Sequence, residues 1–162
     1  MRLHSEVALS SIQERLDALG IVLPPPSKPA ANYVPWRRVG DLVYIAGQVP
    51  VVDGDFAWIG KVGRDYSTEE GKECARVVGL AILAQLSGAL DGDLDRVVQA
   101  VKLNGFVNCT PDFGEQPHVI NGASELMIQV FGEAGRHARA AVGVAGLPFG
   151  VAVEIDGVFQ VR

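Results

Sequence analysis

RAAVGVAGLPFGVAVEIDGVFQV, at residues 139–161, is the stretch that decides the predicted fold. It contains two runs rich in valine and alanine, with the turn-forming residues LPFG between them at 147–150. This pattern is typical of an antiparallel β-hairpin. Because side chains alternate between the two faces of a strand, one predicted face is apolar and the other is small and charged. The apolar face comprises Ala140, Val142, Val144, Val151, Val153 and Ile155, and the second face comprises Arg139, Ala141, Gly143, Ala145, Ala152, Glu154 and Asp156.

The second face has a floor of side chains no larger than a methyl group, with charged groups at one end. In a hairpin centred between residues 147 and 148, Arg139 lies opposite Asp156 and Ala141 lies opposite Glu154. Arg139 is the first candidate for a binding residue, because a guanidinium can hold a carboxylate through two hydrogen bonds. The alternative is a structural ion pair with Asp156. Glu154 either positions a water beside the ligand or is a solvated surface charge.

The composition indicates a globular chain, because 162 residues with 48% hydrophobic and 20% charged positions are enough for one domain. A formal net charge of −5 argues against nucleic-acid binding, since that affinity comes mainly from Lys and Arg neutralising phosphates. The sequence has neither a secretory signal pattern nor an apolar run of 18 residues. We therefore expect a cytoplasmic protein without a membrane or nucleic-acid partner.

Metal-type spacing is absent from the sequence. Cys74 and Cys109 lie far apart, and His4, His118 and His137 do not form a spaced set. We expect both cysteines to be reduced and each histidine to be structural or exposed. The sequence also lacks a Gly-x-Ser-x-Gly nucleophile motif and a phosphate loop. The residues therefore predict no metal site.

The first half of the chain predicts a short helix, an extended segment and two strands. Residues 5–20 have apolar positions at helical spacing and end in a glycine. The proline-rich residues 23–29 are expected to run extended across the surface. Two strands are predicted within 33–49, broken at 40–41, and the first is expected at a sheet edge because of Pro35. Glycine and aspartate then predict a loop or a loose hairpin.

Two long helices are predicted in the second half. Ser67 and Glu70 form a capping-box pattern that predicts a helix from about 68 to 88. Residues 96–108 are β-branched and alternating, which predicts a strand. Pro117 suits the first turn of a second helix that continues to a glycine at 132 or 135. The order of elements predicts an α+β sheet with both long helices packed on one face.

Three segments of the chain resemble the RidA (YjgF-type) imine/enamine deaminase family. The central one looks like the family's middle strand and its Asp-Phe turn, and the last looks like the family's arginine-bearing signature. The segments are LVYIAGQVP at 42–50, VKLNGFVNCTPDF at 101–113 and HARAAVGVAGLPFGVAVEID at 137–156. The phrase NYVPWRRVGDLVYIAGQVP resembles a branch of the family with an added N-terminal helix.

The resemblance implies a chorismate-mutase-like α+β subunit of one domain over residues 1–162. Residues 1–31 would form the N-terminal helix and lead-in, and residues 32–162 the core. It also implies a homotrimer with three clefts at the subunit interfaces, each lined by the sheet edge. Residues 114–118 are an insertion that is expected to reshape the mouth of the pocket.

The resemblance further implies roles for particular residues. Arg139 would hold the substrate carboxylate, and Glu154 would position the attacking water. Ala141 stands where many members have cysteine, so a thiol takes no part here. The substrate-binding residues expected on this basis are Arg139, Tyr33, Asn121, Gly47, Gln48 and Ala141.

The reaction implied is hydrolysis of reactive 2-imino or 2-enamino acids to 2-oxo acids and ammonia. It needs no metal and no organic cofactor, because an imine is already electrophilic. One alternative is a non-catalytic or chaperone-like trimer that binds small carboxylates. A second is a pathway-specific deaminase, for example one acting on an aromatic ring-cleavage enamine. RNA cleavage is a third, weakened by the acidic net charge.

Overall fold

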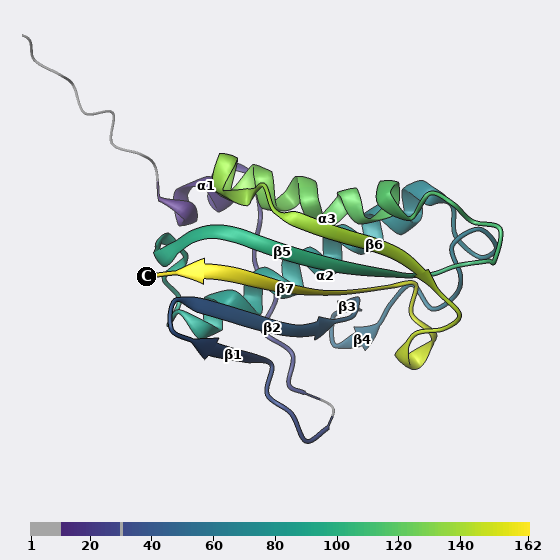
Figure 1. Ribbon diagram of the computed structural model, residues 1–162, viewed down its shortest axis with the longest axis horizontal. Helices are drawn as coiled ribbons and strands as arrows, with labels where there is room; N and C mark the ends of the chain where they lie inside the picture. Colours follow the sequence, from purple (N-terminus) through teal and green to yellow (C-terminus); the bar gives the residue numbers. More distant parts are fainter. Residues whose placement is uncertain (1–10, 30) are drawn as a thin grey trace, which may run out of the picture.

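A five-stranded sheet with two long helices on one of its faces forms the fold (Figure 1). The computed structural model describes residues 11–29 and 31–162. Its elements, in chain order, are α1 (Ile12–Ala18), β1 (Trp36–Val39), β2 (Leu42–Gln48), β3 (Val51–Val52), β4 (Asp55–Phe56), α2 (Thr68–Ala89), η1 (Leu94–Arg96), β5 (Val97–Asn108), α3 (Gln116–Phe131), η2 (Gly132–Gly135), β6 (Ala138–Val144), η3 (Pro148–Gly150) and β7 (Val153–Val161).

The strand order is β1-β2-β7-β5-β6, so the predicted hairpin of the last two strands is wrong. Strand β5 lies between β6 and β7 (Figure 1) and pairs with both. It is parallel to β6 and antiparallel to β7. Helix α3 makes the crossover that a parallel pair requires. Residues 145–152 then carry the chain past the end of β5, where Asn108 N donates to Ala152 O at 2.9 Å.

The predicted pairs of Arg139 with Asp156 and of Ala141 with Glu154 therefore do not form. Arg139 lies beside Leu103 on one edge of β5, and Glu154 lies beside Phe106 on the other edge. The predicted sorting of faces fails for the same reason. Val153 and Ile155 are buried under the helices, whereas Val142 of β6 is exposed on the opposite face.

Local signals placed most of the other elements correctly. Ser67 and Glu70 make both hydrogen bonds of the capping box at the start of α2, so that prediction is confirmed. Pro117 lies in the first turn of α3, which ends before Gly132 at φ 64°. Gly40, at φ 60°, turns the chain between β1 and β2, and β1 lies at the sheet edge as expected.

The N-terminal helix is shorter than predicted within the described residues. Helix α1 begins at Ile12 behind the capping residue Ser11, and it ends at Ala18. Residues 5–10 of the predicted helix lie outside the described residues. The glycine-rich region after β2 contains a two-stranded hairpin, β3 with β4, which confirms the loose hairpin predicted there.

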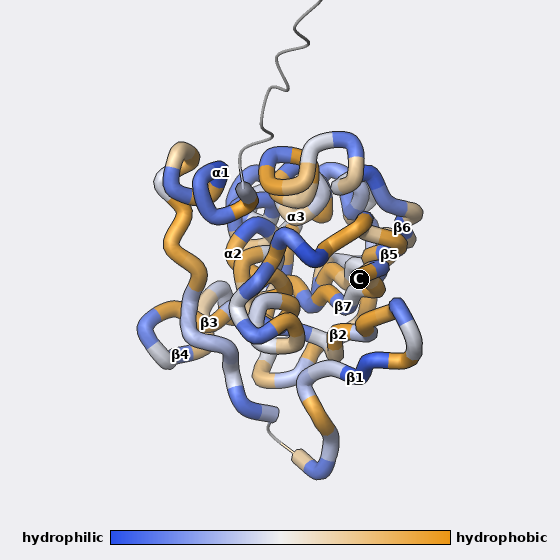
Figure 2. Tube along the Cα trace, turned by 90° about the vertical axis from the view of Figure 1, so that its left-hand side faces the viewer, coloured by the Kyte–Doolittle hydropathy of each residue, from blue (hydrophilic) through white to orange (hydrophobic). Residues whose placement is uncertain are grey.

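Both long helices cover the same face of the sheet, as predicted (Figure 2). Between the helices and the sheet lie fully buried side chains, each contributing about 1.5–3 kcal/mol by its removal from water. They include Ile82 and Leu86 of α2, Leu126 and Met127 of α3, Leu103 of β5, and Ile155 and Phe159 of β7. The opposite face of the sheet has no covering layer within the described part of the chain. None of the described helices has the length and apolar character needed to cross a membrane.

The close approach of α2 and α3 depends on Gly122. A Cβ atom there would overlap the carbonyl oxygen of Lys72. We expect Gly122→Ala to lower the free energy of unfolding by about 1–3 kcal/mol, because the packed helices must separate. Gly88→Ala is the matched control, since Gly88 lies on α2 with open space around it. The control should be neutral or up to about 1 kcal/mol stabilising. Urea unfolding of both variants tests this, and equal stabilities would contradict it.

Candidate active site

Arg139 lies on β6 with its guanidinium directed toward α3. Its Nη1 donates hydrogen bonds to Asn121 Oδ1 at 2.8 Å and to Ser124 Oγ at 3.1 Å. These two acceptors are three residues apart, so they share one side of the helix. Both are neutral, and no carboxylate among the described residues pairs with Arg139. The guanidinium therefore keeps an uncompensated charge that suits an anionic ligand.

His137, which directly precedes β6, extends this network. Its Nδ1 lies 2.7 Å from the carbonyl oxygen of Gly135, and its Nε2 lies 2.9 Å from Ser124 Oγ. A carbonyl only accepts, so Nδ1 carries the proton. Burial lowers the pKa of His137, and the charge of Arg139 lowers it further, which favours the neutral ring. Nε2 then accepts from the Ser124 hydroxyl, whose oxygen accepts from Arg139.

The part played by Ser124 was not predicted from the sequence, and His137 was predicted only to be structural or exposed. Two signals could have found them. Ser124 follows Asn121 by three positions, which is the spacing of neighbours on a helix surface. His137 precedes Arg139 by two positions, which is the spacing of neighbours on one face of a strand.

Glu154 lies on β7, and its carboxylate sits directly above the backbone of Gly47. A Cβ atom at Gly47 would lie 2.5 Å from Glu154 Oε1. Glycine at this position therefore makes the room that the carboxylate occupies. Glu154 has no hydrogen-bond or ion-pair partner for its carboxylate within residues 11–29 and 31–162. Burial raises its pKa, and the nearby charge of Asp156 raises it further.

Asp156 has a structural role that the sequence left unassigned. Its Oδ1 accepts a hydrogen bond of 2.7 Å from Asn104 Nδ2, across the β5–β7 pair. The alternative of an ion pair with Arg139 is therefore wrong. Asp156 and Glu154 share a face of β7, which explains why the charge of one disfavours ionisation of the other.

Arg139 and Glu154 lie on opposite faces of the sheet. Arg139 is in register with Leu103, whose side chain is fully buried beneath the helices. Glu154 is in register with Phe106, three positions further along the same strand. Side chains an odd number of positions apart on a strand point to opposite faces of the sheet. Within one chain, the predicted carboxylate holder and the predicted water-positioning group therefore face away from each other.

A pocket of about 930 Å³ adjoins Glu154. Tyr33, Gly47 and Gln48 line it, so the structure brings these three predicted residues together with Glu154. Arg139, Asn121 and Ala141 do not line this pocket. Ala141 lies two positions from Arg139 on β6, partly buried against the core. The predicted site residues thus fall into two groups, one around Arg139 and one around Glu154.

Neither group resembles a metal centre. Across residues 11–29 and 31–162, no three His, Cys, Asp or Glu side chains are grouped as metal ligands. Cys74 and Cys109 are free and buried, and burial raises the pKa of the Cys74 thiol to about 12. The group around Arg139 offers a cation that can bind the carboxylate of a ligand. The group around Glu154 offers a carboxyl group that can exchange a proton.

The chain belongs to the YjgF/chorismate mutase-like family. The family model, described as "YjgF/chorismate_mutase-like, putative endoribonuclease", matches residues 13–153. This result confirms the resemblance in sequence and the expected chorismate-mutase-like α+β fold.

Individual relatives match along nearly the whole chain. Protein TCP17 of Trypanosoma cruzi is 47% identical over 159 residues, which cover 98% of this chain and 99% of that protein. The crystal structure of Atu1372 from Agrobacterium tumefaciens is 48% identical with a TM-score of 0.87, covering 93% of this chain and 92% of that one. A Shewanella oneidensis MR-1 structure described as a "putative endoribonuclease" is 32% identical with a TM-score of 0.90, covering 94% and 100%.

We expect Glu154→Gln to stabilise the protein at neutral pH. The folded protein raises the pKa of Glu154 above its unfolded value, so the wild type loses stability as the pH rises through the folded pKa. Glutamine carries no charge at any pH. The difference in free energy of unfolding between variant and wild type should be smallest at pH 4 and grow toward pH 7.

Urea unfolding at one protein concentration across this pH range measures the difference. Glu73→Gln, at an exposed position on α2, is the control and should show no such trend. A difference between Glu154→Gln and wild type that stays constant with pH would contradict the raised pKa.

Proposed function

We propose that the protein hydrolyses reactive 2-imino and 2-enamino acids to 2-oxo acids and ammonia in the cytoplasm. The main support is the combination of two groups without partners of opposite charge among the described residues. Arg139 is a cation held by neutral oxygens, and Glu154 is a carboxyl group with a raised pKa beside a large pocket. The free cysteines accord with a reducing compartment.

The chemistry assigned to the two groups is simple. The Arg139 guanidinium holds the substrate carboxylate and fixes the C=N carbon relative to the site. Glu154 accepts a proton from a water molecule as the water adds to that carbon, and returns a proton to the nitrogen as ammonia leaves. Addition of water turns the C=N bond into one C–O and one C–N single bond. The remaining C–N bond then breaks while the hydroxyl loses its proton and becomes the C=O of the 2-oxo acid, and both protons of the water leave with the nitrogen as ammonia. A raised pKa suits a group that must both accept and donate a proton near neutral pH.

We propose that each site is shared between two copies of the chain in a homotrimer. Arg139 lies on β6, the edge strand, while Glu154 faces the uncovered side of the sheet. A head-to-tail contact between copies can bring the edge of one chain to the pocket of the next, and such contacts close into rings. The uncovered face carries exposed apolar side chains, including Tyr44 and Val142, whose burial would stabilise the assembly.

The binding-only alternative uses the same arginine. A trimer that captures small carboxylates needs Arg139 but has no use for a carboxyl group with a raised pKa. RNA cleavage, suggested by the family description, receives little support from a chain with a net charge of −5.

Arg139→Ala should lower kcat/KM for an enzymatically generated imine by about a hundredfold, because losing a charge-assisted bidentate contact costs about 3 kcal/mol. Arg136→Ala is the matched control, since Arg136 is exposed and pairs with Glu133 at the surface. Ammonia release above the uncatalysed rate is the readout. Equal release by wild type and Arg139→Ala would remove the proposed role. Tight binding of 2-oxo acids without any turnover would favour the binding-only alternative.

Mixed oligomers test the shared site. Arg139→Ala and Glu154→Gln should each be nearly inactive alone. A co-expressed 1:1 mixture should recover about one quarter of the wild-type activity per chain, because that share of head-to-tail interfaces combines an intact Arg139 with an intact Glu154. If both groups came from one chain, no intact site would form and the mixture would stay inactive.

A further inference from the structure

A proline-rich strap, residues 22–29, bounds one side of the Glu154 pocket. The strap leaves α1 and runs past α2 on the helix-covered side of the sheet (Figure 2). The pocket reaches from the strap to Glu154 at the end of β2, where Gly47, Gln48 and Val49 line it. Gln85 of α2 donates from Nε2 to the carbonyl oxygen of Ser27 at 2.8 Å, and Ser27 Oγ donates to Gln48 Oε1 at 3.3 Å. Gln85 and Gln48 are only 2% and 6% exposed. These buried amides fasten the strap, since leaving them unpaired would be costly.

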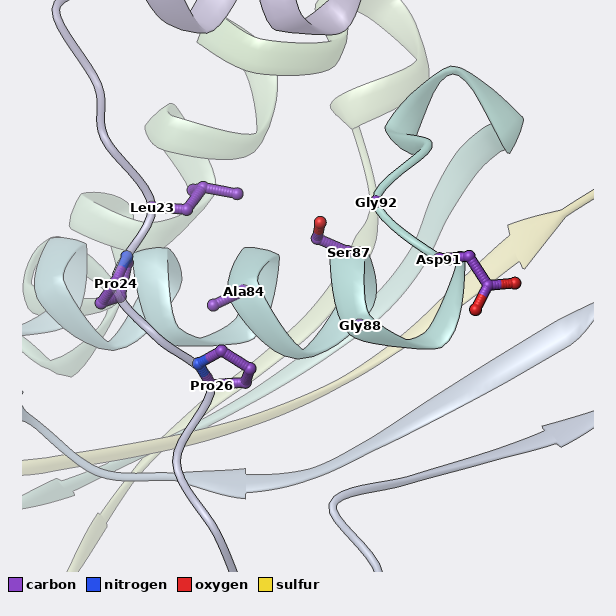
Figure 3. A pocket seen from close by; sticks show the side chains of 8 residues that line it. All are labelled: Leu23, Pro24, Pro26, Ala84, Ser87, Gly88, Asp91 and Gly92. Atoms are coloured by element: carbon purple, nitrogen blue, oxygen red, sulfur yellow. The ribbon is translucent and has the colours of Figure 1, made fainter.

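The strap is a fixed wall for two further reasons. Four of its eight residues are prolines, whose rings restrict φ and favour an extended chain. The strap also runs along α2, where Leu23 packs against the core and Pro24 and Pro26 lie near Ala84 and Ser87 (Figure 3). Only a small pocket of about 320 Å³ remains there. The wall is therefore formed before any ligand binds.

Two phenylalanine side chains also line the Glu154 pocket. Phe56 and Phe149 stack with ring centroids 4.1 Å apart and planes 16° apart. Both line the pocket, and they remain 41% and 56% exposed. Phe149 has φ 59°, a left-handed conformation that is unfavourable for a bulky residue. An exposed aromatic face maintained at a conformational cost suggests that something flat packs against it.

The size and chemistry of the pocket exceed the needs of a three-carbon substrate. A volume of about 930 Å³ lies at the upper end of the roughly 300–1,000 Å³ typical of sites for drug-sized ligands. Most of its lining is proline, valine, alanine and phenylalanine, and its charged residues are Lys28, Asp53 and Glu154. Burying an apolar group there is favourable, whereas 2-aminoacrylate would leave most of the space to water.

We infer that this pocket receives a flat apolar side chain of the substrate, so that the preferred substrates are 2-imino acids with aromatic or large apolar side chains. The reacting carbon lies beside Glu154, and the side chain lies between the strap and the Phe56–Phe149 pair. The inference rests on the proposed function for the reaction. The prediction of an aromatic or large apolar side chain rests on the shape of the pocket and does not depend on the reaction.

Competing imines test the inference. A flavin-dependent amino-acid oxidase generates them from phenylalanine and from alanine, and kcat/KM is measured for each. The wild type should favour the phenylalanine-derived imine by at least about tenfold, and Phe149→Ala should remove most of that preference. Phe56→Ala should act in the same direction. Leu19→Ala, an exposed apolar truncation outside the pocket, is the control and should keep the wild-type ratio.

Calorimetry separates this inference from the proposed reaction. Wild type should bind phenylpyruvate about tenfold more tightly than pyruvate, and Phe149→Ala should reduce the difference. If neither imine is turned over but this selectivity is found, the proposed reaction fails, and the assignment of the pocket to a flat apolar side chain stands. If both imines are turned over at equal kcat/KM and both 2-oxo acids bind equally, the reaction stands and the inference is overturned. A preference that survives both phenylalanine substitutions would also overturn it.

Discussion

The hydrogen bonds that β5 makes on both of its edges are the constraint on which the rest of the structure depends. This strand pairs in parallel with β6 and antiparallel with β7, and it keeps these two strands apart. Helix α3 must then cross the sheet between β5 and β6. That crossover brings Asn121 and Ser124 over Arg139. The hydrogen bonds that hold the Arg139 guanidinium therefore follow directly from the strand order.

The same constraint separates the two chemical groups. Because Arg139 and Glu154 are in register with positions of β5 that face opposite ways, they are kept apart by the thickness of the sheet. This separation avoids an internal ion pair between them, which would neutralise both groups. Arg139 keeps its charge among neutral oxygens, and Glu154 keeps a raised pKa above Gly47. A fold that separates complementary groups in this way suits a site completed by a second copy of the chain.

Local chemistry made much of the fold predictable. The Ser67–Glu70 capping box, Pro117 in a first helical turn and the glycine between β1 and β2 act over a few residues, so the sequence shows them directly. The hairpin of residues 139–161 failed because strand pairing is a long-range choice. Two adjacent β-type runs look alike whether they pair with each other or with a third strand. Only β5, more than thirty residues earlier, decided between these arrangements.

The sequence by itself determined the residue types of the candidate site, including Arg139, Glu154 and the small residues around them, because these are readable from pattern and resemblance. The tertiary structure alone decided which of these residues meet. It joined Arg139 to Ser124 and His137, and it joined Glu154 to Gly47, the strap and the phenylalanine pair. The physical reason is that a contact depends on strand order, register and face, and these depend on packing between segments far apart in the chain.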